Sequence, residues 1–87
     1  MKIKLYALKD TLVAFKNIWT SHNDETAIRT VKSSLEAEKI PTSEIEDLQL
    51  WYLGTYNDQT GIIESNPTFI AKLTDIKNGG GKSNELL

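Results

Sequence analysis

Cysteine is absent from this chain of 87 residues, and histidine occurs once, at His22. Without thiols the protein can form no disulfide, no thiolate metal site and no cysteine nucleophile. The acidic cluster of Glu44, Glu46 and Asp47 lies in an expected surface connector, with no base or nucleophile pattern nearby. We therefore expect a non-enzymatic protein with no catalytic residues, no metal and no cofactor.

Long apolar runs are missing as well. No segment approaches the roughly 20 apolar residues that a membrane-spanning helix needs, and no apolar stretch of signal-peptide length follows the first lysines. We expect a cytoplasmic protein that does not bind membranes. A single domain of this size buries roughly 60% of the surface that its unfolded chain exposes, so we expect modest stability unless the protein oligomerises.

Acidic residues slightly outnumber basic ones, which gives a net charge of −2 and a pI near 5.3. This balance argues against indiscriminate nucleic-acid binding. The charge is unevenly distributed, because residues 1–34 carry a net charge of +3, residues 35–71 carry −6 and residues 72–87 carry +1. Two interpretations stay open, a molecule with one basic side or ordinary solvated charges.

A first hairpin is predicted from alternating residue types. Apolar and polar residues alternate over residues 2–7, which indicates a half-buried strand with Ile3, Leu5 and Ala7 on its apolar side. Residues 9–11 form the expected connector, and residues 12–19 form the expected second strand.

One long helix is predicted next. Ser21 or Asn23 can cap it by accepting a hydrogen bond from a free backbone N–H of its first turn, and Pro41 ends any continuation. The expected buried stripe is Ala27, Ile28, Val31 and Leu35.

A second hairpin follows the helix. Residues 48–56 are rich in apolar and aromatic residues, which predicts a strand. Residues 57–61 are typical of a turn, because Asn and Asp side chains bond their own backbone and Gly61 can adopt a positive φ. Ile62 then begins the return strand.

The segment after this hairpin allows two structures. Ser65-Asn66-Pro67 favours a helix start, with Phe69, Ile70, Leu73 and Ile76 at helical spacing. A strand through residues 69–73 is the alternative. Residues 1–77 are predicted to form one domain, and residues 78–87 a flexible Gly-rich tail.

These elements predict the α+β class, with a four-stranded antiparallel sheet, one main helix packed on one face (ββαββ) and a short C-terminal helix. The other sheet face stays open. The 7 aromatic residues exceed what one small helix-covered face can hide, which favours a homodimer or another interface.

Three segments in order carry a family resemblance: Met1-Lys2-Ile3-Lys4-Leu5-Tyr6, then Asn23-Asp24-Glu25-Thr26-Ala27-Ile28-Arg29, then Leu53-Gly54-Thr55-Tyr56-Asn57-Asp58-Gln59-Thr60-Gly61. This arrangement resembles the small non-structural protein of gokushovirus-type microviruses, which are phages with single-stranded circular DNA. The resemblance covers the chain from Met1 to about Pro67. It implies a DNA-binding protein of the host bacterial cytoplasm that acts in viral genome synthesis or packaging.

Several residues are candidates for contact with DNA. Lys2, Lys4 and Tyr6 alternate along the first strand, so their side chains would share one outward face over about 13 Å. A basic row with a ring on which bases can stack is typical of sequence-tolerant single-strand binders. The full candidate set is Lys2, Lys4, Tyr6, Lys16, Trp51, Arg29 and Lys32.

Each candidate also has an ordinary structural explanation. Strand lysines protect a sheet against edge-to-edge aggregation, and Glu25 is placed to pair with Arg29 four residues later. Our first hypothesis is a DNA-binding homodimer that prefers single strands. The alternative is a homo-oligomeric protein-interaction module that binds a viral replication or capsid component and makes no DNA contact.

Overall fold

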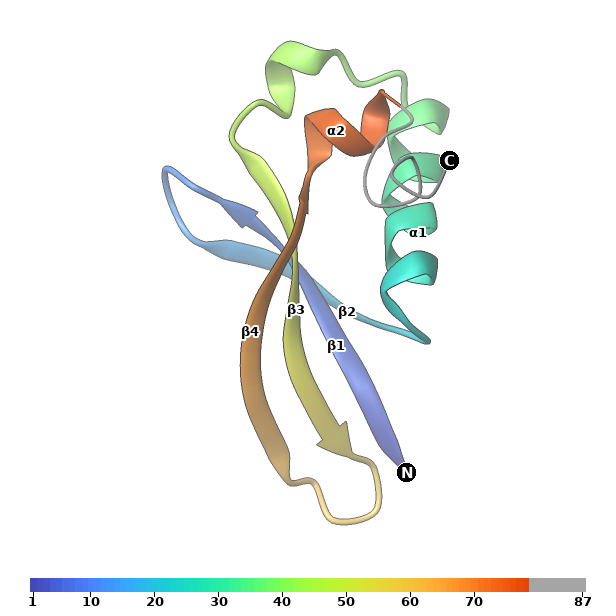
Figure 1. Cartoon of the computed structure of the whole chain (residues 1–87), viewed down its shortest axis with the longest axis vertical. Coiled ribbons are helices and arrows are strands. Elements are labelled where there is room, and N and C mark those ends of the chain that lie inside the picture. Colours follow the sequence, from blue (N-terminus) through green and yellow to red (C-terminus); the bar gives the residue numbers. More distant parts are fainter. Residues whose placement is uncertain (79–87) are drawn as a thin grey trace.

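The computed structural model describes residues 1–78 and shows one antiparallel sheet with two helices (Figure 1). The elements are β1 (Lys2–Asp10), β2 (Phe15–Ser21), α1 (Asp24–Ala37), a 3-10 turn η1 (Thr42–Glu44), β3 (Leu48–Asn57), β4 (Ile63–Lys72) and α2 (Leu73–Lys77). The strand order is β2-β1-β3-β4, with every neighbouring pair antiparallel. The predicted α+β class, the ββαββ order and the short C-terminal helix are confirmed. The predicted tail lies outside the described residues except for Asn78.

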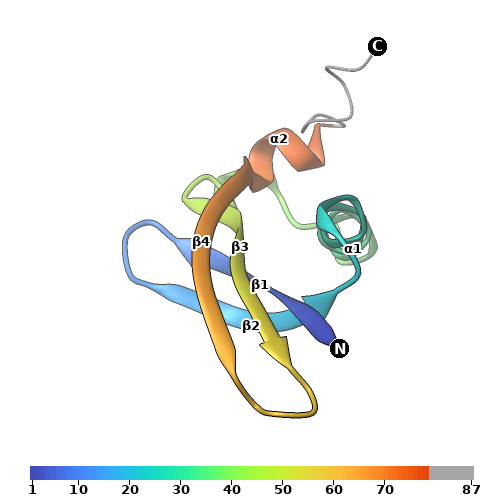
Figure 2. The same cartoon turned by 60° about the horizontal axis from the view of Figure 1, so that its bottom comes forward.

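Both helices cover the same face of the sheet, which we call the helix-covered face; the opposite one is the open face. The hydrophobic core consists of buried side chains from the sheet, from both helices and from Ile45, which directly follows η1. Its members are Tyr6, Ala27, Val31, Leu35, Ile45, Leu50, Ala71, Leu73 and Ile76. Figures 1 and 2 show the helices side by side, with the β3–β4 hairpin extending past them. The far half of the sheet therefore has no helix against it.

The start of α1 follows the predicted capping chemistry. Asn23 is the N-cap, and its side-chain oxygen accepts a hydrogen bond of 2.8 Å from the backbone N–H of Thr26. Ala27, Val31 and Leu35 are buried, as the helical spacing predicted, whereas Ile28 is only half-buried.

The orientation of β1 is the main correction to the sequence analysis. Tyr6, expected on the outward face, is fully buried in the core. Its hydroxyl donates a 2.7 Å hydrogen bond to the carboxylate of Asp24, at the start of α1. Burial, followed by this hydrogen bond, raises the pKa of the Tyr6 phenol above its ordinary value. The apolar positions Ile3, Leu5 and Ala7 consequently point to the open face.

The first hairpin turns later than expected. Residues 11–14 form the connection, and Leu12 and Val13, predicted in the second strand, are 76% and 82% exposed. The side chain of Asp10 explains this turn, because it accepts a hydrogen bond of 3.0 Å from the backbone N–H of Leu12. The backbone N–H of Asp10 then bonds to the carbonyl of Ala14 at 2.9 Å.

The helix predicted to start at residues 65–67 is wrong, and the alternative strand is correct. β4 continues through this segment to Lys72, and α2 begins only at Leu73. Pro67 is tolerated because β4 is an edge strand and the pairing with β3 shifts register around this proline. Pairing with β3 overrides the local helix signal.

Gly54 marks a point where β3 changes register against both of its neighbours. Its φ is +137°, a conformation that favours glycine, and a Cβ atom placed there would lie 2.1 Å from the backbone oxygen of Glu64. The close approach of β4 to β3 therefore requires glycine at this position.

Replacing Tyr6 with phenylalanine should lower the free energy of unfolding by about 1–3 kcal/mol, because the Asp24 carboxylate loses its buried donor. Tyr52→Phe is the control. The Tyr52 ring lies 5.6 Å from that of Tyr6, but its hydroxyl donates no hydrogen bond within residues 1–78. Urea denaturation of both variants measures the effect. An equal loss for Tyr52→Phe would mean that the hydroxyl–carboxylate bond contributes nothing specific.

Gly54→Ala should destabilise the protein by more than about 2 kcal/mol, because strain at positive φ adds to a backbone clash. Gly61→Ala is the matched control: its φ is +78°, but a Cβ there meets nothing within 4 Å. We expect a loss of about 1–2 kcal/mol for the control. Thermal unfolding of both variants tests this, and equal losses would contradict the proposed role of the β3–β4 approach.

Candidate nucleic-acid interface

Three aromatic rings meet on the open face, one from each of three strands. Phe15 of β2 and Phe69 of β4 both contact Trp51 of β3 edge-on, at centroid distances of 5.5 Å and 6.0 Å. Phe15 is 41% exposed and Phe69 47% exposed, so their faces remain accessible. We call Phe15, Trp51 and Phe69 the ring cluster.

Cross-strand pairing builds the ring cluster. Trp51 pairs directly with Ala7 of β1 on one side and with Phe69 of β4 on the other. Ala7 is fully buried although it lies outside the core cluster, and the large ring of Trp51 is its direct cross-strand neighbour. The small residue on β1 leaves space in which the larger rings of the neighbouring strands meet.

Lys9 places a positive charge at the ring cluster. Its Nζ lies 5.2 Å from the centroid of Phe15 and 4.9 Å from that of Trp51. This geometry is a cation–π contact, which holds the ammonium group beside the rings instead of leaving it to sample the solvent freely.

A polar row runs next to the ring cluster. Lys9 pairs with Gln49 of β3, and Gln49 pairs with Lys72 of β4. Lys9 and Lys72 therefore lie on the open face with one strand between them, and their Cα atoms are about 10 Å apart. Gln49 also accepts a hydrogen bond of 2.8 Å from the indole N–H of Trp51, which fixes the orientation of that ring.

The sequence-predicted candidates do not assemble on one face. Trp51 lies on the open face, whereas Lys2, Lys4, Tyr6 and Lys16 share the helix-covered side of β1 and β2 by alternation and register. Arg29 and Lys32 lie on α1, which packs against that same side. Trp51 is thus separated by the sheet from the six other candidates.

Lys2 and Lys4 are exposed because they lie on the half of the sheet that extends past the helices. Lys2 forms a 2.8 Å ion pair with Glu64. This hydrogen-bonded pairing raises the pKa of Lys2 and lowers the pKa of Glu64. A partner carboxylate makes Lys2 a weaker phosphate ligand than a free lysine. The expected Glu25–Arg29 pair is not among the ion pairs of residues 1–78.

Lys9, Gln49 and Lys72 were not among the candidates predicted from the sequence. Phe15 entered only the count of aromatic residues, and Phe69 entered that count and the predicted helix. One signal was available in β1. Leu8 continues the row of Lys2, Lys4 and Tyr6 with an apolar side chain, which indicates that this row enters the core. Lys9, on the opposite row, then marks the solvent side.

The other half of the open face is uncharged. Ile3, Tyr56 and Ile63 form one cross-strand row, and Leu5, Gly54 and Ser65 form the next. Ile63 is 66% exposed. No ionised side chain belongs to either row.

A family model described as Phage ORF5 protein matches residues 3–76. The chain belongs to the Phage ORF5 protein family. The match spans the sheet, both helices up to Ile76, the ring cluster and the polar row. No curated protein and no solved structure matches this Phage ORF5 protein.

Two further observations describe the surface of this phage protein. Within residues 1–78, His, Asp and Glu residues form no group of three or more that could hold a metal ion. Over the same residues, neither helix has the length and apolar character needed to cross a membrane.

Proposed function

We propose that this phage protein binds single-stranded DNA of the virus through the ring cluster and the polar row of the open face. Support comes chiefly from one observation: two exposed rings, Phe15 and Phe69, both contact Trp51, and a lysine lies about 5 Å from Phe15 and Trp51. Unpaired bases stack on such rings without regard to sequence, and adjacent lysines neutralise phosphates. In duplex DNA the faces of the bases are stacked on each other and cannot stack on protein rings, so single strands fit this surface better.

The proposed role of this binding is to hold nascent viral strands during genome synthesis or packaging in the host bacterial cytoplasm. The protein's net charge of −2 supports weak binding at physiological salt, because most of its surface repels phosphate. Binding would therefore depend on the local cations Lys9 and Lys72 and weaken as salt increases.

Paired charge removals test which face binds DNA. In Lys9→Ala/Lys72→Ala, the slope of log K against log salt should become less steep by about 1.4, since each phosphate contact on single strands contributes about 0.7. Arg29→Ala/Lys32→Ala removes the same charge from α1 and should leave the slope unchanged.

Phe69→Ala should weaken binding by about 1–3 kcal/mol for one lost stacked base. Fluorescence anisotropy with a labelled oligothymidine strand measures all three variants.

A duplex of matching length and an Ile62→Ala variant are the controls. Ile62 is 62% exposed and lies in the β3–β4 turn, away from the ring cluster. Equal effects of the two double variants would refute an interface on the open face. Absence of binding at low salt would refute DNA binding itself.

The second candidate function is self-association and protein binding without DNA contact, including contact with a replication or capsid component. The uncharged rows around Ile63 favour it, because two copies can meet there without charge repulsion. A homodimer would also bury apolar surface that a small domain exposes at a cost in stability.

Sedimentation equilibrium of Ile63→Gln tests this association. We expect the dimer dissociation constant to rise about tenfold, because a buried isoleucine becomes polar at the interface. Ile18→Gln is the matched control: this isoleucine is 64% exposed on β2, the edge strand on the other side of the sheet from β4. A monomeric wild-type protein at all concentrations, or equal effects of both substitutions, would contradict a dimer through these rows.

A further inference from the structure

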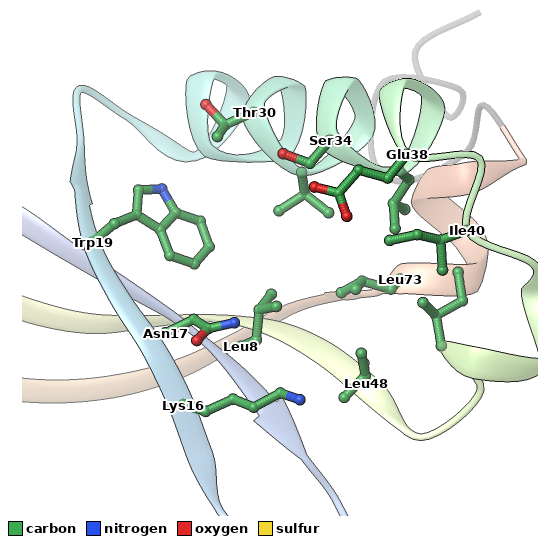
Figure 3. A pocket seen from close by; sticks show the side chains of 13 residues that line it. Leu8, Lys16, Asn17, Trp19, Thr30, Ser34, Glu38, Ile40, Leu48 and Leu73 are labelled. Atoms are coloured by element: carbon green, nitrogen blue, oxygen red, sulfur yellow. The ribbon is translucent and has the colours of Figure 1, made fainter.

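A groove of about 370 Å³ lies between α1 and β2, on the side of the sheet opposite the ring cluster (Figure 3). Its floor is apolar and comes from four parts of the chain, with Leu8, Val31, Leu48 and Leu73 among the side chains. Polar side chains stand at its rim. This combination of an apolar floor and a few polar rim groups is typical of binding sites, and the volume lies in their usual range.

The local backbone explains the groove. Asn17 has a φ of +55°, and the pairing of β1 with β2 shifts register here, which indicates a bulge. Lys16 and Asn17, before and at the bulge, line one wall of the groove, while Trp19, after it, packs against the core. Thr30 and Ser34 line the opposite wall from the flank of α1.

β2 is an edge strand, so its outer backbone groups have no neighbouring strand within residues 1–78. The groove runs beside this edge. An extended peptide that pairs with β2 would insert alternate side chains into the groove, since side chains of a strand alternate between two faces. Backbone pairing supplies the affinity in this binding mode, and the pocket beside the edge supplies the specificity.

The charged side chains at the rim of the groove indicate which residues a bound peptide would carry. Lys16 on β2 and Glu38, the C-cap of α1, are both exposed, and neither takes part in an ion pair of the described residues. Opposite charges on the two walls fit a segment that carries an acidic and a basic residue on either side of its apolar residues.

Trp19 supplies a second observation. Its indole Nε1 is buried and has no hydrogen-bond partner within residues 1–78. A buried donor without an acceptor is costly, and such groups are rare in native proteins. A carbonyl of a bound peptide would supply the acceptor that this donor lacks.

We infer that the groove between α1 and β2 is a docking site for an extended peptide segment of a partner protein, with alternating leucine-like residues between an acidic and a basic residue. This site is independent of the DNA-binding surface, from which the sheet separates it. The same small protein would then hold a single strand on one face and a protein partner on the other.

Two synthetic peptides test the inference: acetyl-Glu-Thr-Leu-Thr-Leu-Thr-Lys-amide and its reversed sequence, because either strand direction can pair with β2. Titration into ¹⁵N-labelled full-length protein should shift the indole N–H signal of Trp19 and the backbone amides of β2. Ser34→Trp, which fills the groove from an exposed position, should weaken binding at least about tenfold, because the burial of one leucine is lost.

Ser33→Trp is the matched control, since Ser33 is exposed on the same helix but does not line the groove. If Ser34→Trp does not fold, Lys16→Glu replaces it and should bind a peptide whose Glu is replaced by Lys better than the original peptide. No shift with either peptide at about 5 mM, shifts confined to the open face, or equal binding by both tryptophan variants would overturn the inference. A concentration-dependent shift without peptide would assign the groove to a second copy of this chain.

Discussion

The burial of Tyr6 in the core is the constraint on which the rest of the structure depends. Its hydroxyl donates a hydrogen bond to Asp24, which joins the middle of β1 to the first turn of α1. Because side chains alternate along a strand, every other orientation in β1 follows from this one. Ile3, Leu5 and Ala7 must face outward, and the open face acquires its apolar character.

An apolar open face differs from a basic one in the interactions that it can make. A basic face would bind phosphate through charge alone, whereas this face offers aromatic rings with two lysines beside them. We propose unpaired bases as the ligand of the rings and a protein as the alternative partner of the uncharged half. The groove beside α1 adds a third surface on the opposite side of the sheet. In this protein of the Phage ORF5 family, the two sheet faces thus differ in their chemistry: aromatic rings lie on the open face and an apolar groove lies beside α1 on the other.

Local signals in the sequence were sufficient for most of the elements and insufficient for the candidate site. Asn23 as a cap, the buried stripe of α1 and the second hairpin depend on interactions within a few residues, so the sequence predicted them. The segment around Pro67 failed because a helix start and an edge strand place proline equally well. Its pairing with β3 decides between them, and that pairing joins distant residues.

The sequence by itself determined the fold class, the succession of strands and helices along the chain and the position of the main helix, because these follow from residue periodicity and from capping and turn chemistry. Only the tertiary structure decided which face of the sheet the helices cover. Both rows of β1 contain apolar residues, so alternation alone cannot select the buried row. The burial of Tyr6 against α1 selects it, and this choice brings Phe15, Trp51 and Phe69 together from three strands.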